Sequence, residues 1–360
     1  MHSLSRLTNG LPISVIFLTF ALGGLGGLLA MAAGLPLAML MGSMIASAAA
    51  PMLGVRFFGH VPNVPQKWRF ILVPVIGVAI GASFPHDFLT QAKQWWVTIA
   101  ALFVFIPVAH GVGYGLFRKL GKLSPQTAYY ASMPGGFIES LEMGEKSGAD
   151  MTMLIMLQFL RLILCIVMIP IGFSIVEGHA VGSGSGLSIG PRPDLTLLDT
   201  GVMVSLALIG WFAAHKLRLP AAVLSGPLLL SGLAHALGLT QAVPPFWAIL
   251  VTQCVMGTSL GVRLAGFTKG QAGLALTLSV INVTVILLIA LGIALVLSGP
   301  VGEPVSAVIL AFAPGGVSEM SLAALSLQVS AVYVSLHHLI RIILAVFVAR
   351  LGRRFIHPAA

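Results

Sequence analysis

Charged residues are scarce in this sequence. Of its 360 residues only 8% are charged and 58% are hydrophobic, whereas a typical soluble domain has about 25% charged residues. A water-soluble fold of this size has too little interior to bury so much apolar surface. The composition therefore excludes an ordinary soluble enzyme and predicts a polytopic integral membrane protein.

Cysteine is almost absent as well. Cys165 and Cys254 both lie inside apolar runs, which predicts packing residues in place of a disulfide or a metal-binding pair. The sequence also lacks a phosphate-binding loop, a nucleophile triad and a redox motif. We therefore expect no enzymatic activity, no cofactor and no metal.

The formal net charge of +9 would suggest a nucleic-acid partner in a soluble protein. In a membrane protein, loop lysines and arginines set the orientation across the bilayer. No basic cluster interleaved with aromatic residues is present, so we expect no direct contact with nucleic acid.

Long apolar runs recur along the chain. A spanning helix needs about 20 apolar residues, and backbone groups inside a bilayer must pair within the helix. The alternating pattern of a barrel strand is absent, so the sequence predicts an all-α fold. The expected helical runs are residues 11–33, 70–84, 95–117, 151–176, 196–214, 246–260, 273–297 and 331–349.

One segment rich in glycine, serine and proline divides the chain. Residues 177–195 read as a flexible linker, and they separate a membrane repeat at 1–176 from a second repeat at 196–360. Rare residues recur in the same order in both halves, which predicts an internal duplication. The offset is 184 residues at the start, where "LPLAMLMG" from Leu35 matches "LPAAVLSG" from Leu219, and 180 residues from Gly77 onward.

Basic loops alternate between the halves. The first half has basic residues in the loops near residues 56–69 and 118–122, whereas the matching loops near 239–243 and 299–304 have none. Under the positive-inside rule the two repeats therefore face opposite ways. This predicts an inverted repeat with five plus five spanning helices, cytoplasmic termini and an external linker.

A Pro-Gly-Gly sequence followed by a glutamate occurs once in each half. About ten residues precede and follow each break, and ten helical residues rise about 15 Å, half the apolar thickness of a bilayer. Proline and paired glycines break a helix. Each segment is therefore expected to be a re-entrant hairpin or a broken helix whose tip lies at mid-membrane.

The candidate site residues cluster around these breaks. A glutamate in the first turn of a half-helix suits the positive end of the helix dipole, and it either caps that half-helix or binds an ion. An arginine within an apolar helix is costly unless it is paired or hydrated, so it either neutralises the nearby glutamate or binds an anion. The polar residue three positions earlier lies on the same helix face. The candidate substrate- or ion-binding residues are Gly135, Gly136, Glu139, Gln158, Arg161, Gly315, Gly316, Glu319, His338 and Arg341.

Two further patterns involve paired histidines and paired glycines. Adjacent His337 and His338 point in different directions on a helix and have no second ligand cluster, so hydrogen bonding or protonation is favoured over a metal site. GxxxG pairs permit close helix approach, and packing within the chain is favoured over a dimer seam. These pairs are Gly23/Gly27, Gly77/Gly81, Gly111/Gly115 and Gly257/Gly261.

The blocks "PGGFIESLEMG" and "PGGVSEMSLAALS", each followed by a helix with a central arginine, resemble the AbrB-type membrane protein family. That resemblance implies a tandem-duplicated membrane domain and residence in a bacterial inner membrane. Labels attached to the family include ammonia monooxygenase and regulator of gene expression. An oxygenase needs a cofactor or metal with a ligand set, and none is visible in this sequence.

Inverted repeats with broken mid-membrane segments are typical of secondary transporters. We therefore expect an ion-coupled transporter of a small organic anion, with the glutamates binding a proton or sodium ion and the arginines binding the anion. The alternatives are a membrane sensor that affects gene expression through a partner, or a channel. The expected partners are a small-molecule or ion substrate and the lipid bilayer, and a homodimer is left open.

Overall fold

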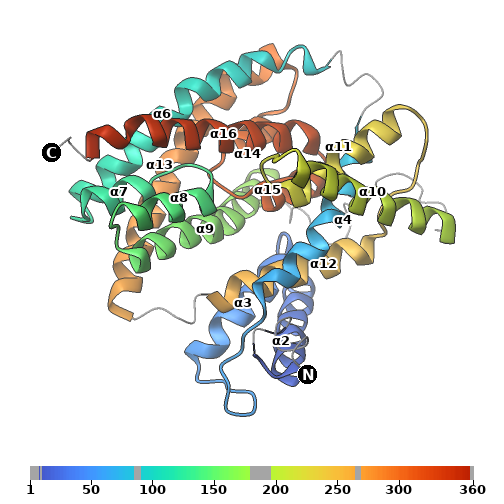
Figure 1. The fold of residues 1–360 in the computed structure, drawn as a ribbon, viewed down its shortest axis with the longest axis horizontal. Coiled ribbons are helices and arrows are strands. Elements are labelled where there is room, and N and C mark those ends of the chain that lie inside the picture. Colours follow the sequence, from blue (N-terminus) through green and yellow to red (C-terminus); the bar gives the residue numbers. More distant parts are fainter. Residues whose placement is uncertain (1–7, 9, 85–90, 179–195, 264–268, 357–360) are drawn as a thin grey trace. The chain divides into compact units, whose positions relative to one another are not determined.

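The protein is all-helical in the residues that the structure describes. This computed structural model describes residue 8 and residues 10–84, 91–178, 196–263 and 269–356. Within these ranges the chain forms helices, and one isolated β-bridge joins Phe57 to His60 (Figure 1). Most of the linker predicted at 177–195 lies outside the described residues.

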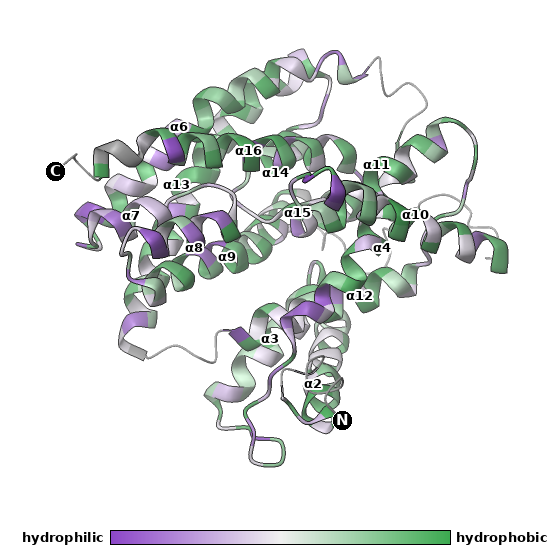
Figure 2. Cartoon of the chain, in the orientation of Figure 1, coloured by the Kyte–Doolittle hydropathy of each residue, from purple (hydrophilic) through white to green (hydrophobic). Residues whose placement is uncertain are grey.

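The long helices have membrane-spanning length and composition. Figure 2 shows them coloured predominantly hydrophobic. Six helices of the described part are long and apolar enough to cross a membrane: Ile13–Ala32, Trp96–Lys119, Met151–Val176, Leu197–Lys216, Gly270–Val301 and Ala331–Gly352. The prediction of an all-α polytopic membrane protein is confirmed. The runs expected at 70–84 and 246–260 form the helices Arg69–Gly81 and Phe246–Gly261, which are shorter than the six candidate spans.

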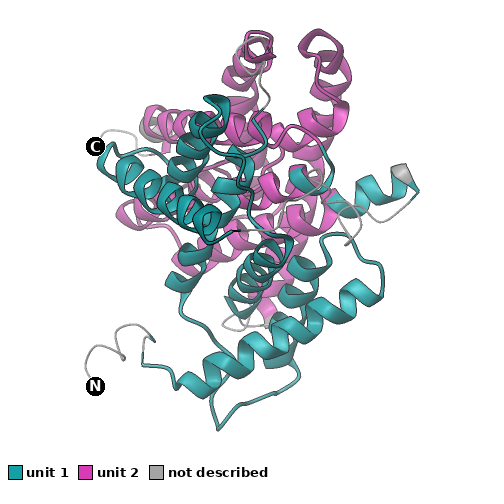
Figure 3. Ribbon diagram, turned by 90° about the vertical axis from the view of Figure 1, so that its right-hand side faces the viewer, with its two compact units in different colours: residues 1–86, 170–266, 325–328 teal, residues 87–169, 267–324, 329–360 magenta. Residues whose placement is uncertain are grey.

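The chain divides into two compact units, and each unit takes helices from both halves of the sequence (Figure 3). The predicted repeat boundaries concern duplication of the sequence and stay a prediction. Unit 1 contains α2 (Ile13–Ala32), α3 (Ala38–Met52), η1 (Gln66–Trp68), α4 (Arg69–Gly81), α10 (Leu197–Lys216), α11 (Ala222–Ala236) and α12 (Phe246–Gly261). Unit 2 contains α6 (Trp96–Lys119), α7 (Pro125–Ala131), α8 (Phe137–Lys146), most of α9 (Met151–Glu177), α13 (Lys269–Val301), α14 (Val305–Phe312), most of α15 (Val317–Ser326) and α16 (Ala331–Ile356).

Glycines bring the helices of unit 1 into backbone contact. A Cβ built on Gly77 would lie 2.7 Å from the Leu224 carbonyl oxygen, so α4 packs directly on α11. Gly257 lies in the same way against Leu40, which packs α12 on α3. These contacts are equivalent under the two sequence offsets, because 40 plus 184 is 224 and 77 plus 180 is 257.

The GxxxG expectation is wrong for one pair. Nothing lies within 4 Å of a Cβ built on Gly111 or Gly115, whereas the other three pairs meet neighbouring helices. The two glycines of α6 therefore do not support close packing within this chain.

This difference gives a prediction about stability. A Cβ on Gly81 would lie 2.6 Å from the Leu228 carbonyl oxygen and 2.7 Å from the Gly232 nitrogen. Because backbone atoms cannot move aside cheaply, Gly81→Ala should destabilise the protein by about 1–3 kcal/mol. Thermal unfolding of the full chain in detergent measures the effect. Gly111→Ala is the control, and it should leave the unfolding temperature unchanged or raise it, because alanine is the better helix former. Equal losses in both variants would contradict the packing described.

Candidate functional site: two hairpin tips and two buried arginines

The first Pro-Gly-Gly segment is the turn of a helical hairpin. The Asp150 backbone N–H donates to the Thr127 hydroxyl at 2.9 Å, and the Ser147 hydroxyl donates to the Tyr130 hydroxyl at 3.0 Å. The start of α7 therefore lies beside the end of α8, and residues 134–136 form the turn at the far end (Figure 1). Gly136 has φ +68°, a left-handed conformation that favours glycine.

Helix α9 runs along this hairpin and carries Arg161 to its tip. The Gln158 amide donates to the Tyr130 carbonyl at 2.9 Å, and Arg161 donates to the Met133 carbonyl. Helix α7 therefore runs in the same direction as α9. Arg161 lies ten residues into α9, which is about 15 Å along its axis and half the apolar thickness of a bilayer.

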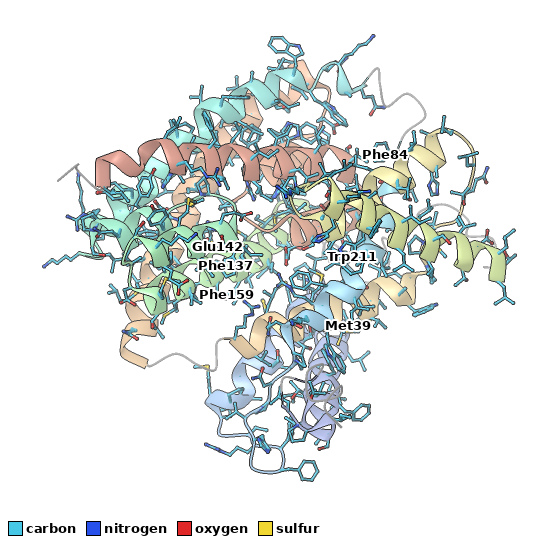
Figure 4. The ribbon with its side chains drawn as sticks, in the orientation of Figure 1. Met39, Phe84, Phe137, Glu142, Phe159 and Trp211 are labelled. Atoms are coloured by element: carbon cyan, nitrogen blue, oxygen red, sulfur yellow. The ribbon has the colours of Figure 1, made fainter. Side chains whose placement is uncertain are left out.

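Aromatic packing fixes the returning helix on α9. Phe137 at the start of α8 and Phe159 of α9, both labelled in Figure 4, meet edge to face with ring centroids 4.9 Å apart. Further out, a Cβ built on Gly144 would overlap the Leu154 side chain. Because residues 137 and 144 meet residues 159 and 154 in turn, α8 runs back antiparallel to α9.

The second Pro-Gly-Gly segment repeats this geometry on α16. His338 Nε2 donates to the Leu310 carbonyl at 2.9 Å, and Arg341 donates to the carbonyls of Ala313 and Gly315. Helix α14 therefore runs in the same direction as α16. The returning helix α15 contacts α16 near the start of α16, where the hydroxyl oxygens of Ser321 and Ser335 are 2.6 Å apart.

The corresponding hydrogen bonds recur at a constant offset of 180 residues. The bond between residues 158 and 130 matches the bond between 338 and 310. The bond between 161 and 133 matches the bond between 341 and 313. The two hairpins therefore have the same local architecture, as a sequence duplication would produce.

The two hairpins approach Arg341 from opposite ends of α16. The Tyr129 hydroxyl donates to the Ala349 carbonyl at 3.0 Å, while a Cβ on Gly135 would lie 3.6 Å from the Arg341 carbonyl oxygen. Helix α7 therefore runs antiparallel to α16, whereas α14 runs parallel to it. Both tips meet this helix near Arg341.

The arginines bind the carbonyl ends of the broken helices. Arg161 and Arg341 are 4% and 1% exposed, and the hydrogen bonds found for them end on backbone carbonyls. A cation is favoured at the C-terminal end of a helix, where α7 and α14 break. The Nε of each arginine is buried without a hydrogen-bond partner. The two roles predicted for each arginine were neutralising the nearby glutamate and binding an anion. The structure has no glutamate–arginine hydrogen bond at these residues, and each Nε is left as a free donor.

The glutamates occupy the other side of each break. Glu139 and Glu319 both lie in the first turn of the returning helix. Each carboxylate folds back toward the second glycine of its Pro-Gly-Gly, because a Cβ on Gly136 would lie 3.2 Å from the Glu139 carboxylate and a Cβ on Gly316 would overlap the Glu319 carboxylate. Negative charge is favoured at this N-terminal end. Each tip therefore pairs a cation at one broken end with an anion at the other.

The two tips differ in their polar surroundings. Glu319 is 4% exposed and accepts a hydrogen bond from the Ser318 hydroxyl at 3.0 Å, whereas Glu139 is half-buried. The residues at the first tip that correspond to the three serines at the second are apolar. Ser318, Ser321 and Ser335 correspond at offset 180 to Ile138, Leu141 and Ile155.

Two more predicted residues leave free polar atoms beside the arginines. Gln158 Oε1 and His338 Nδ1 are buried without a partner, although the other polar atom of each side chain holds a carbonyl. Buried polar atoms normally have partners, and these atoms lie near the unpartnered Nε atoms of Arg161 and Arg341 in the sequence of α9 and α16.

All ten predicted site residues therefore lie in unit 2, at or beside the two hairpin tips. Sequence analysis assigned Cys165 to packing and did not place it beside the arginines, although its buried thiol lies close enough to Arg161 and Arg341 to interact with both charges. It also missed the pairing of His337 Nε2 with the Thr98 hydroxyl at 2.9 Å. No group of three or more potential metal ligands occurs in the described part of the chain.

Comparisons with known proteins agree with the sequence resemblance. Residues 51–357 match the AbrB family, described as "Transition state regulatory protein AbrB". The chain is 23% identical over 355 residues to "Uncharacterized protein YhjN" of Bacillus subtilis (strain 168), covering 94% of this chain and 92% of that protein. It is also 24% identical over 237 residues to "Putative regulator AbrB" of Escherichia coli (strain K12), covering 65% of each. The match over most of its length shows that this chain belongs to the AbrB family.

Proposed function

We propose that this protein is a secondary transporter that moves a small organic anion by alternating access. The observation that carries the proposal is the meeting of two oppositely directed hairpins at buried arginines whose hydrogen bonds end on backbone carbonyls. Irregular backbone at membrane depth is tolerated where it is buried or lines a cavity. Transporters use broken helices of this kind to bind substrates and ions near the bilayer midplane.

The charges support an anionic substrate. Arg161 and Arg341 lie close enough to repel each other, and the unfilled Nε atoms can donate to a carboxylate. An anion between the arginines would relieve the repulsion. In this proposal Glu139 and Glu319 bind the coupling ion, because each is a carboxylate at a break in the backbone.

The topology proposed here has five spanning helices per repeat, opposite orientations, cytoplasmic termini and a bacterial inner membrane. It is supported by the two hairpins. The first returns to the end at which it began, and in the second both α14 and the returning α15 contact the part of α16 that precedes Arg341. An odd number of crossings per half then agrees with the switch of basic loops between the halves.

A ligand screen tests the substrate class. Mono-, di- and tricarboxylates, with inorganic phosphate and chloride for comparison, are added to the purified full chain in detergent, and the thermal unfolding temperature is recorded. A binding carboxylate at 100 times its Kd should stabilise the folded protein by about 2.7 kcal/mol. No shift with any carboxylate would contradict the organic-anion proposal.

A flux measurement separates transport from the second candidate function. The name of the Escherichia coli relative contains the word regulator, which favours a membrane sensor that acts on gene expression through a partner. In liposomes, the transporter should accumulate the radiolabelled carboxylate against its gradient when an ion gradient is imposed. Binding without flux would support the sensor, and flux that never exceeds equilibrium would support a channel.

A further inference from the structure

One group of polar residues in unit 2 has no polar counterpart at the other hairpin. If both tips had the same function, similar residues would be expected at positions 180 apart, as Arg161 and Arg341 are. At five positions the chain departs from this pattern. Trp95, Thr98, Glu303, Tyr333 and His337 correspond to Ala275, Leu278, Leu123, Met153 and Leu157.

These residues contact one another in series. The Trp95 indole N–H donates to the Glu303 carboxylate in the connection between α13 and α14. The Trp95 ring meets Tyr333 edge to face at 5.3 Å between centroids, and the Tyr333 ring lies 4.1 Å from that of His337. Trp95, Tyr333 and His337 are buried, whereas Glu303 is half-buried.

The hydrogen bonds around His337 suit both of its protonation states. Nδ1 donates to the Tyr333 carbonyl at 2.8 Å, and Nε2 lies 2.9 Å from the Thr98 hydroxyl. The Thr98 hydroxyl also lies 3.0 Å from the Trp95 carbonyl oxygen. With neutral His337 the hydroxyl donates to Nε2. With protonated His337, Nε2–H donates to the hydroxyl, which turns to donate to the Trp95 carbonyl, so no partner is lost.

The series points toward the arginine site. Tyr333, His337 and Arg341 are spaced by four residues and therefore lie along one face of α16. The same face of α9 carries Met153 and Leu157 before Arg161. A series of polar residues thus leads toward the tips from the Glu303 end, whereas the α9 positions that match Tyr333 and His337 are apolar.

We propose that Glu303 and His337 bind the coupling proton on its way to the hairpin tips, with Glu303 taking it up at the α13–α14 connection and His337 holding it one turn from Arg341. This inference rests on the proposed function and specifies its coupling ion. In the proposed topology this connection faces the outside, from which a proton gradient would drive uptake.

The charges around Glu303 agree with a proton site. Burial raises the pKa of Glu303 to about 7, opposed by the hydrogen bond from Trp95. Glu303 acts electrostatically on Tyr333 of α16, and Trp95, the residue just before α6, is uncharged. Near neutral pH this carboxyl can therefore take up or release a proton in response to a small change in pH.

A fluorescence titration tests the proton site without any transport substrate. The full chain in detergent is titrated from pH 5 to pH 9, and tryptophan emission is recorded. The wild type should show a transition centred near pH 7, because the charge beside the Trp95 indole changes. Glu303→Gln and Trp95→Phe should abolish the transition. Glu142→Gln, which changes the exposed carboxylate labelled in Figure 4, should retain it.

Thermal unfolding provides a second readout with a defined sign. The unfolded glutamate has a pKa of about 4.3, so the folded state binds the proton more tightly and loses stability as pH rises toward 7 and above. The unfolding temperature of the wild type minus that of Glu303→Gln should therefore fall between pH 5 and pH 8. If Glu303→Gln does not fold, Glu303→Asp replaces it and should shift the midpoint of the fluorescence transition.

The role of His337 is tested by proton uptake. In liposomes containing a pH-sensitive dye, with the best carboxylate from the screen outside and a membrane-permeant counter-ion present, an inward proton gradient should acidify the lumen at least tenfold more slowly with His337→Phe than with the wild type. A fluorescence transition that persists in Glu303→Gln, or wild-type proton uptake in folded His337→Phe, would overturn the inference. Either result would leave anion binding at the arginines intact, so the two proposals fail separately.

Discussion

Arg341→Ala lowers the affinity for the transported anion by at least about 30-fold in our account. Truncating one partner of a buried charged contact costs about 2–5 kcal/mol, and 2 kcal/mol corresponds to roughly 30-fold in affinity. Arg341 is 1% exposed and its Nε has no hydrogen-bond partner in the described residues, and in the proposed transporter the anion is that partner. Titration calorimetry with the best carboxylate from the screen measures the loss.

The same helix provides a matched control for this prediction. Arg350 lies on α16 and is exposed, so Arg350→Ala removes an equal charge away from the tips and should bind the anion normally. Arg341→Ala also leaves the carbonyls of Ala313 and Gly315 without their donor, so its folding is checked by size-exclusion chromatography. Arg341→Lys keeps the charge but not the forked geometry, and it should bind more weakly than the wild type. Normal affinity in folded Arg341→Ala and Arg341→Lys would remove the anion site.

Glu319→Gln reduces ion-driven uptake by about tenfold or more, whereas Glu139→Gln has a smaller effect. The reason is the difference between the tips. The buried Glu319 lies in a hydroxyl-containing environment that can hold a proton or cation, while apolar side chains replace these serines near Glu139. Leaving a buried charged site incomplete costs about 1–3 kcal/mol, the energy of a tenfold change.

The comparison requires anion binding to be measured beside uptake. Glu319→Gln should lose concentrative uptake while it still binds the carboxylate, because the arginines are unchanged. Ser318→Ala removes the hydroxyl that donates to Glu319 and should have an intermediate effect on uptake. Equal losses in Glu139→Gln and Glu319→Gln would contradict the functional difference between the tips.

Much of the site was predictable because charges are rare in apolar helices. Glu139, Arg161 and their equivalents stand out from their surroundings, and the constant offset joins the two sets. Proline and glycine in the middle of an apolar run also predicted the breaks, since these residues disfavour a continuous helix. The structure places all of these residues in one unit.

Long-range partners were not predictable from the sequence. Nothing local indicates that Arg161 and Arg341 would bind backbone carbonyls, or that Thr98 would meet His337 across 239 positions of the chain. Local spacing also failed for Gly111 and Gly115, because a GxxxG pattern does not say whether another helix faces it. The grouping of helices from both halves into each unit likewise depends on tertiary contacts.

The measurement that tests the central claim most directly is the sidedness of two equivalent positions. Lys119 at the end of α6 and Gly299 near the end of α13 are both exposed and lie 180 residues apart. Single cysteines are placed at these positions in a chain with Cys165→Ala and Cys254→Ala, and intact cells and inside-out vesicles are treated with a membrane-impermeant maleimide. Our account predicts labelling of position 119 only from the cytoplasmic face and of position 299 only from the outer face. Labelling of both positions from the same face would contradict oppositely directed hairpins and, with them, the proposed transporter.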